Sequence, residues 1–535
     1  MGYLTLAIVG FYLIGLTLLG LWFSRRQTST QAYFVANRSI PPFVVAISIL
    51  STLITSVTFI AYPGSAYSKN WSLLVPGFMV LVVLAIIGPI IVPFYRHQVG
   101  MSTYEYFGRR FGAPTRVYAC VAFAVGHFSK MGFVLYLVAL TVGSMTGWKV
   151  SNIIVIVGVL TTLYTLKGGV EGVIWTDFVQ GIILWVGIVV SLGFLLFLPP
   201  GGPSAVFETA IDSGKFSLGN GSFDFSKPTI PVLVLYGFFW YIQKFTADQT
   251  VVQRYLVAKS DRAAWKGVAL GSVLCVPVWA LFMLIGTCTW SFYKLTGEKL
   301  PAYVTKADQV FPYFLNTHLP AGSSGVILAA LLGAAMCALA SDLNSLASVG
   351  VGDIYRLMRP RADDPQRLRA GKTVVAGCGA LCIAAALALS HTQGSALSMW
   401  YTVSAVASGG LAGLFLLAFL TSRSSRRGVY CGILVTVLFT VWASLTLPEK
   451  RVLDMGAWSF PWHDYMVGVV GHVLLLVVGF CASLIFPDPA DVDQHLRKTT
   501  FSNWLRTRRA ERTGTVTSAS LRADATAPPI SPITN

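Results

Sequence analysis

The chain has few charged side chains, and it is poorest in acidic ones. Only 11% of its 535 residues are Asp, Glu, Lys or Arg, and 22 residues are acidic against 39 basic. A soluble globular protein carries roughly 25% charged residues, because its surface faces water. Hydrophobic residues instead make up 55% of the chain, and the mean hydropathy is +0.67. This composition excludes a soluble multidomain protein, the class that length alone would suggest.

The chain also lacks the motifs that mark enzymes and channels. It contains no phosphate-binding glycine loop followed by Lys and Ser or Thr, no His-Glu-x-x-His and no Cys-x-x-Cys. Its seven histidines are scattered and its eight cysteines fall within apolar stretches, so neither a metal cofactor nor a disulfide framework is predicted. A repeated filter motif of a channel is missing too. We therefore expect no enzyme activity, no catalytic residues and no cofactor.

The chain contains many apolar stretches that are long enough to cross a membrane. A transmembrane helix needs about 20 apolar residues to cross ~30 Å of hydrocarbon. Such stretches run through 4–23, 41–66, 71–95, 117–146, 151–165, 177–198, 230–253, 267–297, 325–355, 373–390, 395–421, 428–446 and 463–486. The sequence predicts an all-α integral membrane protein with about thirteen transmembrane helices.

The basic residues gather in alternate loops between these stretches. They lie at 25–38, 96–116, 254–266, 356–372, 423–427 and 497–512, and Arg254 opens the third of these groups. Loops rich in Lys and Arg stay on the cytoplasmic side of an inner membrane. The alternation predicts a multi-pass plasma (inner) membrane protein, in contact with lipid, with its N-terminus outside and its C-terminus in the cytoplasm. It also accounts for the net charge of +17 without a nucleic-acid partner.

Charged side chains that interrupt the apolar stretches include Lys130, Asp177, Lys244, Asp248 and Asp342. Charges are costly in hydrocarbon, so such residues either mark the path of a solute or ion or pair with one another. Lys244 and Asp248 are i,i+4 neighbours that can neutralise each other, and the start of a helix favours a carboxylate such as Asp177. Lys130 has no oppositely charged neighbour in the sequence. Both interpretations stay open at this point.

Two of the stretches carry signs of a broken helix. The second is crowded with hydroxyl side chains between Ser48 and Thr58 and ends in Pro63 and Gly64, and the seventh is polar over 241–253. Small hydroxyl residues also serve helix packing. However, two breakable helices five spans apart are typical of an inverted-repeat transporter whose binding site lies near the midplane of the membrane. Transport of a small solute is therefore predicted.

Four segments resemble the sodium–solute symporter family, whose members carry sugars, proline, sialic acid and monocarboxylates. They are 57–60 with 63–64, 167–169 with 173–180, 247–256, and 343–345 with 353–355. The resemblance implies a five-plus-five inverted-repeat (LeuT-like) core with broken helices. Residues 1–40 then form the first helix and a cytoplasmic loop, 41–421 the transport core, 422–486 two peripheral helices, and 487–535 a disordered cytoplasmic tail.

The resemblance also implies where cations bind. One Na⁺ is expected where the broken second span meets the ninth, at the carbonyl groups of Ser51, Ile54 and Ala334. Two side chains that usually supply hydroxyl ligands there are Cys337 and Ala338 in this chain. A thiol and a methyl group offer no hard oxygen to Na⁺.

A second cation position of some relatives matches Asp177 and Ser341, with Asp342 as an additional carboxylate. Sodium at this shifted position, protons taken up by Asp342 or Asp177, and uncoupled transport are the alternatives. Na⁺ is the leading expectation because two carboxylates still offer hard oxygen.

The solute is expected between the second, fourth, seventh and eleventh spans. The matching positions that can contact it are Thr55, Thr58, Lys130, Tyr241, Lys244 and Tyr401. Two cations facing one cavity favour an anion such as a carboxylated sugar. A carrier of a neutral sugar or polyol, in which protein carboxylates neutralise both lysines, is the alternative. A membrane sensor on the same scaffold is a third, although the short tail leaves no room for a signalling domain.

Overall fold

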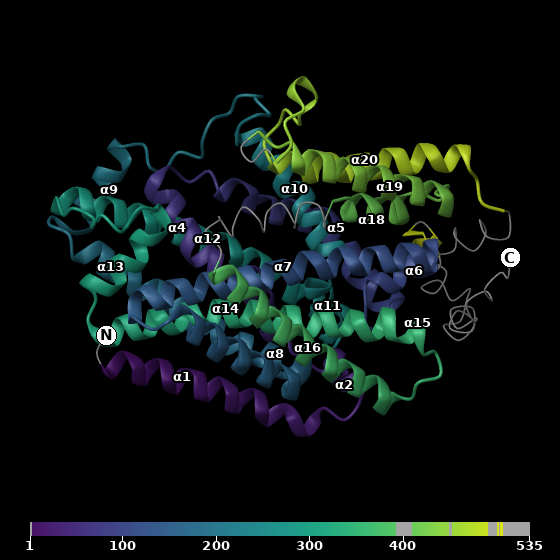
Figure 1. The fold of residues 1–535 in the computed structure, drawn as a ribbon, viewed down its shortest axis with the longest axis horizontal. Coiled ribbons are helices and arrows are strands. Elements are labelled where there is room, and N and C mark those ends of the chain that lie inside the picture. The colour runs from purple at the N-terminus through teal and green to yellow at the C-terminus, as the bar shows by residue number, and fades with distance from the viewer. Residues whose placement is uncertain (1–2, 392–408, 449–451, 490–499, 502, 507–535) are drawn as a thin grey trace.

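The computed structural model describes residues 3–391, 409–448, 452–489, 500–501 and 503–506 (Figure 1). Within these ranges the chain is built from helices, joined by loops and by one isolated β-bridge between Ile40 and Ala258. The helices are α1 (Tyr3–Trp22), α2 (Thr30–Val35), α3 (Pro42–Leu53), α4 (Ser56–Ser68), α5 (Leu74–Gln98), α6 (Tyr104–Phe111), α7 (Ala113–Thr146), α8 (Val150–Phe197), α9 (Gly202–Asp212), α10 (Ile230–Thr246), α11 (Gln249–Val257), α12 (Asp261–Thr296), α13 (Val310–His318), α14 (Ala321–Val349), α15 (Arg356–Met358), α16 (Asp364–Ser390), α18 (Leu411–Leu420), α19 (Arg426–Leu445) and α20 (Tyr465–Ile485).

The prediction of an all-α, multi-span membrane protein is confirmed. In the described ranges nine helices are long and apolar enough to cross a membrane, or eleven if the bent pairs α3–α4 and α10–α11 each count as one span. The count of about thirteen stays a prediction, and most of the stretch expected at 395–421 lies outside the described residues.

Two predicted spans, 151–165 and 177–198, are joined in the single helix α8 of 48 residues. Gly169 interrupts this helix with φ 57° and ψ −162°. A side chain at this position would lie 2.9 Å from the carbonyl oxygen of Tyr33. Glycine is therefore required here both for the positive φ and for the close approach of α2. The segments on either side of Gly169, 150–168 and 170–197, are each long enough for the ~20 residues that a membrane crossing needs.

The second span is broken as predicted, but the break lies before Ser56, whereas Pro63 and Gly64, the residues that indicate an interruption in the sequence, lie inside α4. Helices α3 and α4 are bent by 58° to each other, and Ile54 and Thr55 between them are extended, with ψ of 115° and 175°. The Thr55 hydroxyl accepts a hydrogen bond from the backbone N–H of Val57 at 3.2 Å. The Thr58 hydroxyl accepts one from the N–H of Thr55 at 3.5 Å. This reciprocal cap starts a new helix inside the span.

The seventh span is broken in the same manner. Helices α10 and α11 are bent by 47°, and Asp248 between them has φ −103° and ψ 112°. The Asp248 carboxylate accepts a hydrogen bond from the N–H of Thr250 at 2.9 Å and so caps α11. Each break therefore begins its second helix with a polar N-cap residue, and these caps, not proline, set the bend.

Helix α14 lies at the centre of the bundle. Of its most apolar segment 94% is buried, and it packs against α1, α7 and α8. Figure 1 shows α1 along one edge of the molecule and α19 with α20 along the opposite edge. Large apolar side chains of α1, including Phe11, Ile14 and Leu18, are exposed, as expected of side chains that face lipid.

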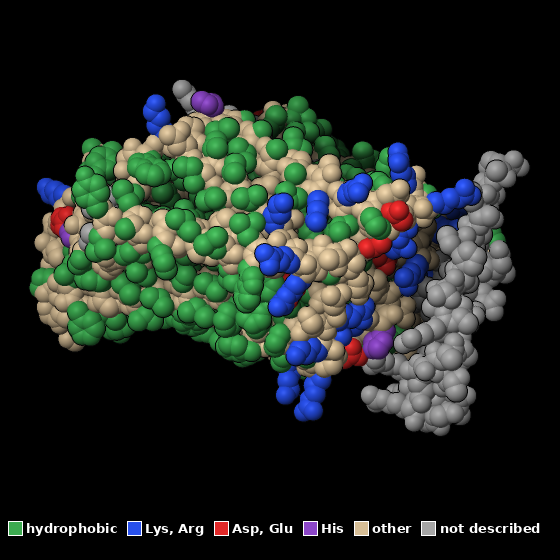
Figure 2. All heavy atoms as spheres, turned by 90° about the horizontal axis from the view of Figure 1, so that it is seen from below, with side chains coloured by type: hydrophobic (Ala, Val, Ile, Leu, Met, Phe, Trp, Pro, Cys, Tyr) green, Lys and Arg blue, Asp and Glu red, His purple; other side chains and the backbone are tan. Residues whose placement is uncertain are grey.

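The surface is divided along the length of the molecule. On the face drawn in Figure 2, hydrophobic side chains cover most of the body, whereas Lys and Arg gather toward one end. Figure 1 places α6, α15 and the C-terminus at this end and the N-terminus at the other. Such an apolar body with a basic end is the pattern expected of a membrane-spanning protein.

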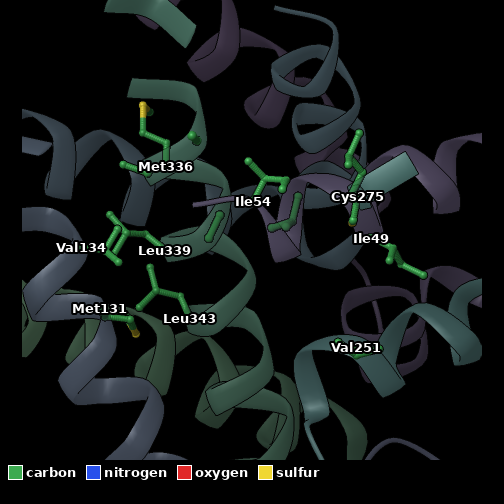
Figure 3. Close-up of a cluster of buried hydrophobic side chains, with 14 of the residues drawn as sticks. Ile49, Ile54, Met131, Val134, Val251, Cys275, Met336, Leu339 and Leu343 are labelled. Atoms are coloured by element: carbon green, nitrogen blue, oxygen red, sulfur yellow. The ribbon is translucent and has the colours of Figure 1, made fainter. Parts of the chain in front are cut away.

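Apolar packing surrounds the break in the second span. Figure 3 shows Met131 and Val134 of α7 beside Leu339 and Leu343 of α14, and Ile54 of the break lies close to the same helix. All five side chains are buried. The broken backbone is thus held in a dry, close-packed frame.

Part of the predicted disordered tail packs onto the helices. The ring of Phe501 lies 4.7 Å from that of Phe419 in α18, and Trp504 lies 5.6 Å from Phe94 in α5. The remainder of that tail, 490–499, 502 and 507–535, is outside the described residues.

Candidate functional site

Two groups of buried charges meet around α14. The first, the Asp177 cluster, consists of Asp177 on α8, Arg254 on α11, Ser48 on α3, and Cys337 and Ser341 on α14. The second, the His127 cluster, consists of His127 and Lys130 on α7, Asp342 on α14, Lys244 on α10, and Asp248 at the break between α10 and α11.

Both oxygens of the Asp177 carboxylate have partners. Oδ2 accepts from Ser48 Oγ at 2.7 Å and from Arg254 Nη2 at 3.2 Å. Oδ1 accepts from Cys337 Sγ at 2.9 Å. The side chains of Asp177 and Arg254 are 0% and 1% exposed. A buried carboxylate without a cation is very costly, so the guanidinium neutralises it.

Arg254 is held from several sides at once. Its Nη2 donates to Ser341 Oγ at 2.6 Å, and its Nη1 donates to the carbonyl of Thr250 at 2.7 Å. Its Nε lies 3.4 Å from Ser48 Oγ. The planar, multiply donating guanidinium suits a site with several fixed oxygens.

The position of Arg254 corrects the sequence-based prediction, which put it in a cytoplasmic loop. The reason is that α11 continues to Val257 beyond the break, so Arg254 still faces the bundle. Arg96 and Arg110, also predicted in a loop, are 6% and 0% exposed. Local composition shows that a residue is basic, but only the path of the chain shows whether it reaches water.

In the His127 cluster one imidazole joins two carboxylates. His127 Nδ1 lies 2.8 Å from Asp342 Oδ1, and Nε2 lies 3.1 Å from Asp248 Oδ2. Each ring nitrogen thus faces one carboxylate oxygen. His127 therefore joins Asp342 and Asp248 in a continuous row of polar side chains across α7, α14 and the α10–α11 break.

A lysine closes each end of this row. Lys130 Nζ lies 2.9 and 2.8 Å from the two oxygens of Asp342, and Lys244 Nζ donates to Asp248 Oδ2. The lysines are 17% and 15% exposed, whereas the aspartates are 1% and 2% exposed. The two lysines thus match the two carboxylates, one at each end of the row.

The predicted carbonyl ligands lie at the first break. Ile54 and Ser51 are buried at the C-terminal end of α3, and Ala334 is buried on α14. The last carbonyl groups of a helix have no partner within the helix and carry its negative dipole end. Ser51 Oγ donates to the backbone oxygen of Asp177 at 3.0 Å, so the first break touches the Asp177 cluster.

The second break differs, because protein hydroxyls already occupy its carbonyl groups. Tyr95 Oη and Thr103 Oγ1 both donate to the carbonyl of Thr246, and Tyr104 Oη donates to that of Ala247 at 2.9 Å. In the described part of the chain no side-chain donor reaches the carbonyl oxygens of Ser51 and Ile54. The first break is therefore the one whose carbonyl groups can receive a cation.

The remaining predicted residues are placed as follows. Cys337 and Ala338 are buried on α14, and Cys337 uses its thiol on Asp177. Thr55 and Thr58 cap the first break, and Tyr241 is buried on α10 with its ring 6.2 Å from Trp279. Tyr401 lies outside the described residues.

A network of side-chain hydrogen bonds joins α11 to α14, which both carry segments of the family resemblance. Gln253 Nε2 on α11 donates to Asn344 Oδ1 at 2.8 Å, and Ser345 Oγ donates to Gln253 Oε1 at 3.1 Å. Gln249 Nε2 reaches Ser348 Oγ at 3.2 Å. These contacts fix α11 against α14 and so set the position of Arg254.

Comparison with known proteins agrees with this architecture. The pattern of the sodium:solute symporter family matches residues 33–436. The sodium/sialic acid symporter NanT of Aliivibrio fischeri is 29% identical over 487 residues, which cover 90% of this chain and 93% of the relative. The sodium/sialic acid symporter SiaT of Proteus mirabilis is 28% identical, with 91% and 96% covered.

A solved structure has the same fold. It is a substrate-bound, outward-open Na⁺-coupled sialic acid symporter, which matches with a TM-score of 0.83 at 28% identity and covers 91% of this chain and 98% of its own. The predicted LeuT-like fold and the predicted transporter class are confirmed, and these relatives are named as Na⁺-coupled. Because the family match extends over well more than half of its residues, the chain belongs to the sodium:solute symporter family.

Proposed function

We propose that this symporter carries a carboxylated sugar of the sialic acid class, or a similar organic anion, inward together with Na⁺. Two relatives that match along most of the chain are named sodium/sialic acid symporters. The observation that carries the proposal is that two partly exposed lysines, Lys130 and Lys244, lie in the same cluster. Each ammonium group has three N–H donors, and charge-assisted hydrogen bonds from lysine to a solute carboxylate are among the strong ones.

The proposed solute site lies between the first break and the His127 cluster. Thr55 and Thr58 offer hydroxyls, Lys130 and Lys244 offer the least buried cations of the cluster, and Tyr241 offers an aromatic ring. Tyr401 completes the set as a sequence-based assignment.

The proposed sodium ion binds to the carbonyl groups of Ser51, Ile54 and Ala334. These oxygens are hard ligands, and those of Ser51 and Ile54 stand at the negative end of the α3 dipole, whereas that of Ala334 belongs to α14. Cys337 and Ala338 add no oxygen ligand, so we expect the ion to keep water molecules in their place. A cation at a broken helix end near the midplane is the arrangement that this class of transporter uses.

One observation favours a neutral sugar or polyol as the alternative solute. Lys130 and Lys244 already pair with Asp342 and Asp248, as expected if the lysines have a purely structural role. In that case the two Lys–Asp pairs are neutral, and any net charge of the His127 cluster depends on the protonation of His127.

We further propose that the N-terminus lies outside and the C-terminus in the cytoplasm. The gathering of Lys and Arg at the end of the molecule that carries α6, α15 and the C-terminus supports this orientation.

The solute is tested with purified protein in liposomes under an inward Na⁺ gradient. Uptake of N-acetylneuraminate is compared with uptake of its carboxamide, which has the same shape without the charge, and with glucose. Preference for the carboxylate by at least about tenfold is expected, the factor that ~1.4 kcal/mol of binding energy supplies. Equal or better uptake of the neutral compounds contradicts the anion proposal and supports the alternative.

A further inference from the structure

The cation position predicted at Asp177 and Ser341 is already filled by part of the protein. Nη2 of Arg254 lies 3.2 Å from Asp177 Oδ2 and 2.6 Å from Ser341 Oγ. Nε of the same side chain lies 3.4 Å from Ser48 Oγ. The guanidinium thus takes the oxygens that a sodium ion at this position would need.

The other possible ligands at this position do not favour a metal ion. Asp177 Oδ1, the second carboxylate oxygen, accepts from the thiol of Cys337 at 2.9 Å. Ala340, the neighbour of Ser341, has only a methyl side chain and offers no oxygen ligand. The nearest additional carboxylate, Asp342, is occupied by Lys130 and His127.

The charges at this position also disfavour a sodium ion. Asp177 and Arg254 are both nearly inaccessible to water, so the carboxylate is balanced one to one by the guanidinium. A sodium ion beside them would be a second cation on one carboxylate, and like charges at close range repel strongly where water does not screen them.

We propose that Arg254 is a tethered cation that replaces one coupled sodium ion, so that this symporter binds a single Na⁺, at the first break, for each solute. The inference deepens the proposed function, on which the choice of solute in the test rests. Because Arg254 is covalently attached, it holds α11 against α8 but is not released into the cell. It therefore adds nothing to the driving force.

The missing ion has a measurable consequence for accumulation. Each coupled Na⁺ contributes a factor of about ten to the maximal solute gradient for every tenfold Na⁺ gradient, since tenfold corresponds to ~1.4 kcal/mol. Loss of one ion lowers the limit by this factor.

The test begins with the wild-type protein. Binding of ²²Na⁺ to purified protein, with and without N-acetylneuraminate, should give one ion per chain, and the flux ratio in liposomes should be one Na⁺ per solute. A stoichiometry of two in either measurement overturns the proposal. The binding measurement needs no transported solute, so failure of the proposed function does not affect it.

Arg254→Gln then removes the tethered cation and frees the oxygens of Asp177 and Ser341 to bind an ion. The expected result is a second bound Na⁺. The apparent melting temperature of this variant should rise with NaCl, relative to choline chloride, by more than that of the wild type. Arg254→Gln combined with Asp177→Asn should return both readings to the wild-type values, because no carboxylate is left to hold the ion.

Two further variants complete the design. Arg96→Gln breaks another Arg–Asp pair, in which the buried Arg96 lies 2.9 Å from the more exposed Asp261, and should leave the number of bound Na⁺ at one. Asp177→Asn with Arg254 intact should also keep one bound Na⁺. If Asp177→Asn loses the ion, or if a folded Arg254→Gln variant gains none, Arg254 does not replace sodium. Should Arg254→Gln fail to fold, the wild-type stoichiometry still decides.

Discussion

Replacement of Lys130 by Met tests whether the His127 cluster binds a solute carboxylate. Methionine is an unbranched side chain of similar size and removes the charge. Lys130 Nζ contacts both oxygens of Asp342 at 2.8 and 2.9 Å, and the side chain is 17% exposed. It is thus the most accessible cation of the cluster and the one best placed to meet an incoming anion.

The expected magnitude follows from these contacts. A charge-assisted hydrogen bond is worth about 1.5–3 kcal/mol, which corresponds to a roughly ten- to hundredfold loss of affinity for the anion. The change also breaks an ion pair, and removal of one partner of a buried pair costs about 3–5 kcal/mol of stability. The lower end is expected, because His127 Nδ1 remains 2.8 Å from Asp342 Oδ1, so the carboxylate keeps one polar partner.

The assay separates binding from stability by comparing two solutes. For Lys130→Met, the KM for N-acetylneuraminate should rise roughly ten- to hundredfold, while the KM for its carboxamide should change less than about threefold. Lys215→Met is the matched control. Lys215 is also buried, but it donates to the carbonyl of Tyr67 at 2.6 Å, outside the cluster, and its replacement should affect both solutes equally. Equal losses for both solutes in Lys130→Met refute the carboxylate role and leave Lys130 a structural partner of Asp342.

Two other predictions concern orientation and the tail. Single cysteines introduced at Ser24 and Asn220, in a background without native cysteines, should react with a membrane-impermeant maleimide from the cytoplasmic and the external side, respectively; the reverse pattern would overturn the orientation. Joint replacement of Phe501 and Trp504 by Ala removes two aromatic contacts with α5 and α18, each worth about 0.5–1.5 kcal/mol. It should lower the apparent melting temperature by a few degrees, and no change would show that this part of the tail does not stabilise the helices.

Hydropathy and local polarity were enough to predict the membrane fold and both broken helices. A membrane-spanning segment can be recognised from its own composition, because charged side chains are excluded from hydrocarbon. The breaks are local as well, since Thr55 and Asp248 cap helices that start one residue later. The division of 150–197 into two spans is local too, because Gly169 interrupts α8 between them with a non-helical backbone.

The pairing of the buried charges could not be predicted in the same way. Lys130 and Asp342 are 212 residues apart, and Arg254 and Asp177 are 77 apart. The sequence identified three of these four residues as charges inside the membrane, but it assigned Arg254 to a loop. His127 was set aside as one of several scattered histidines. Its role depends on two carboxylates that only the fold brings together.

The most direct test of the account is Na⁺-driven uptake by the purified protein in liposomes. An inward Na⁺ gradient alone should concentrate N-acetylneuraminate inside the vesicles, with one ²²Na⁺ entering per solute, and a K⁺ gradient of equal size should not. Accumulation driven by an imposed pH gradient in the absence of Na⁺, or uptake that never exceeds equilibration under any Na⁺ gradient, would contradict it.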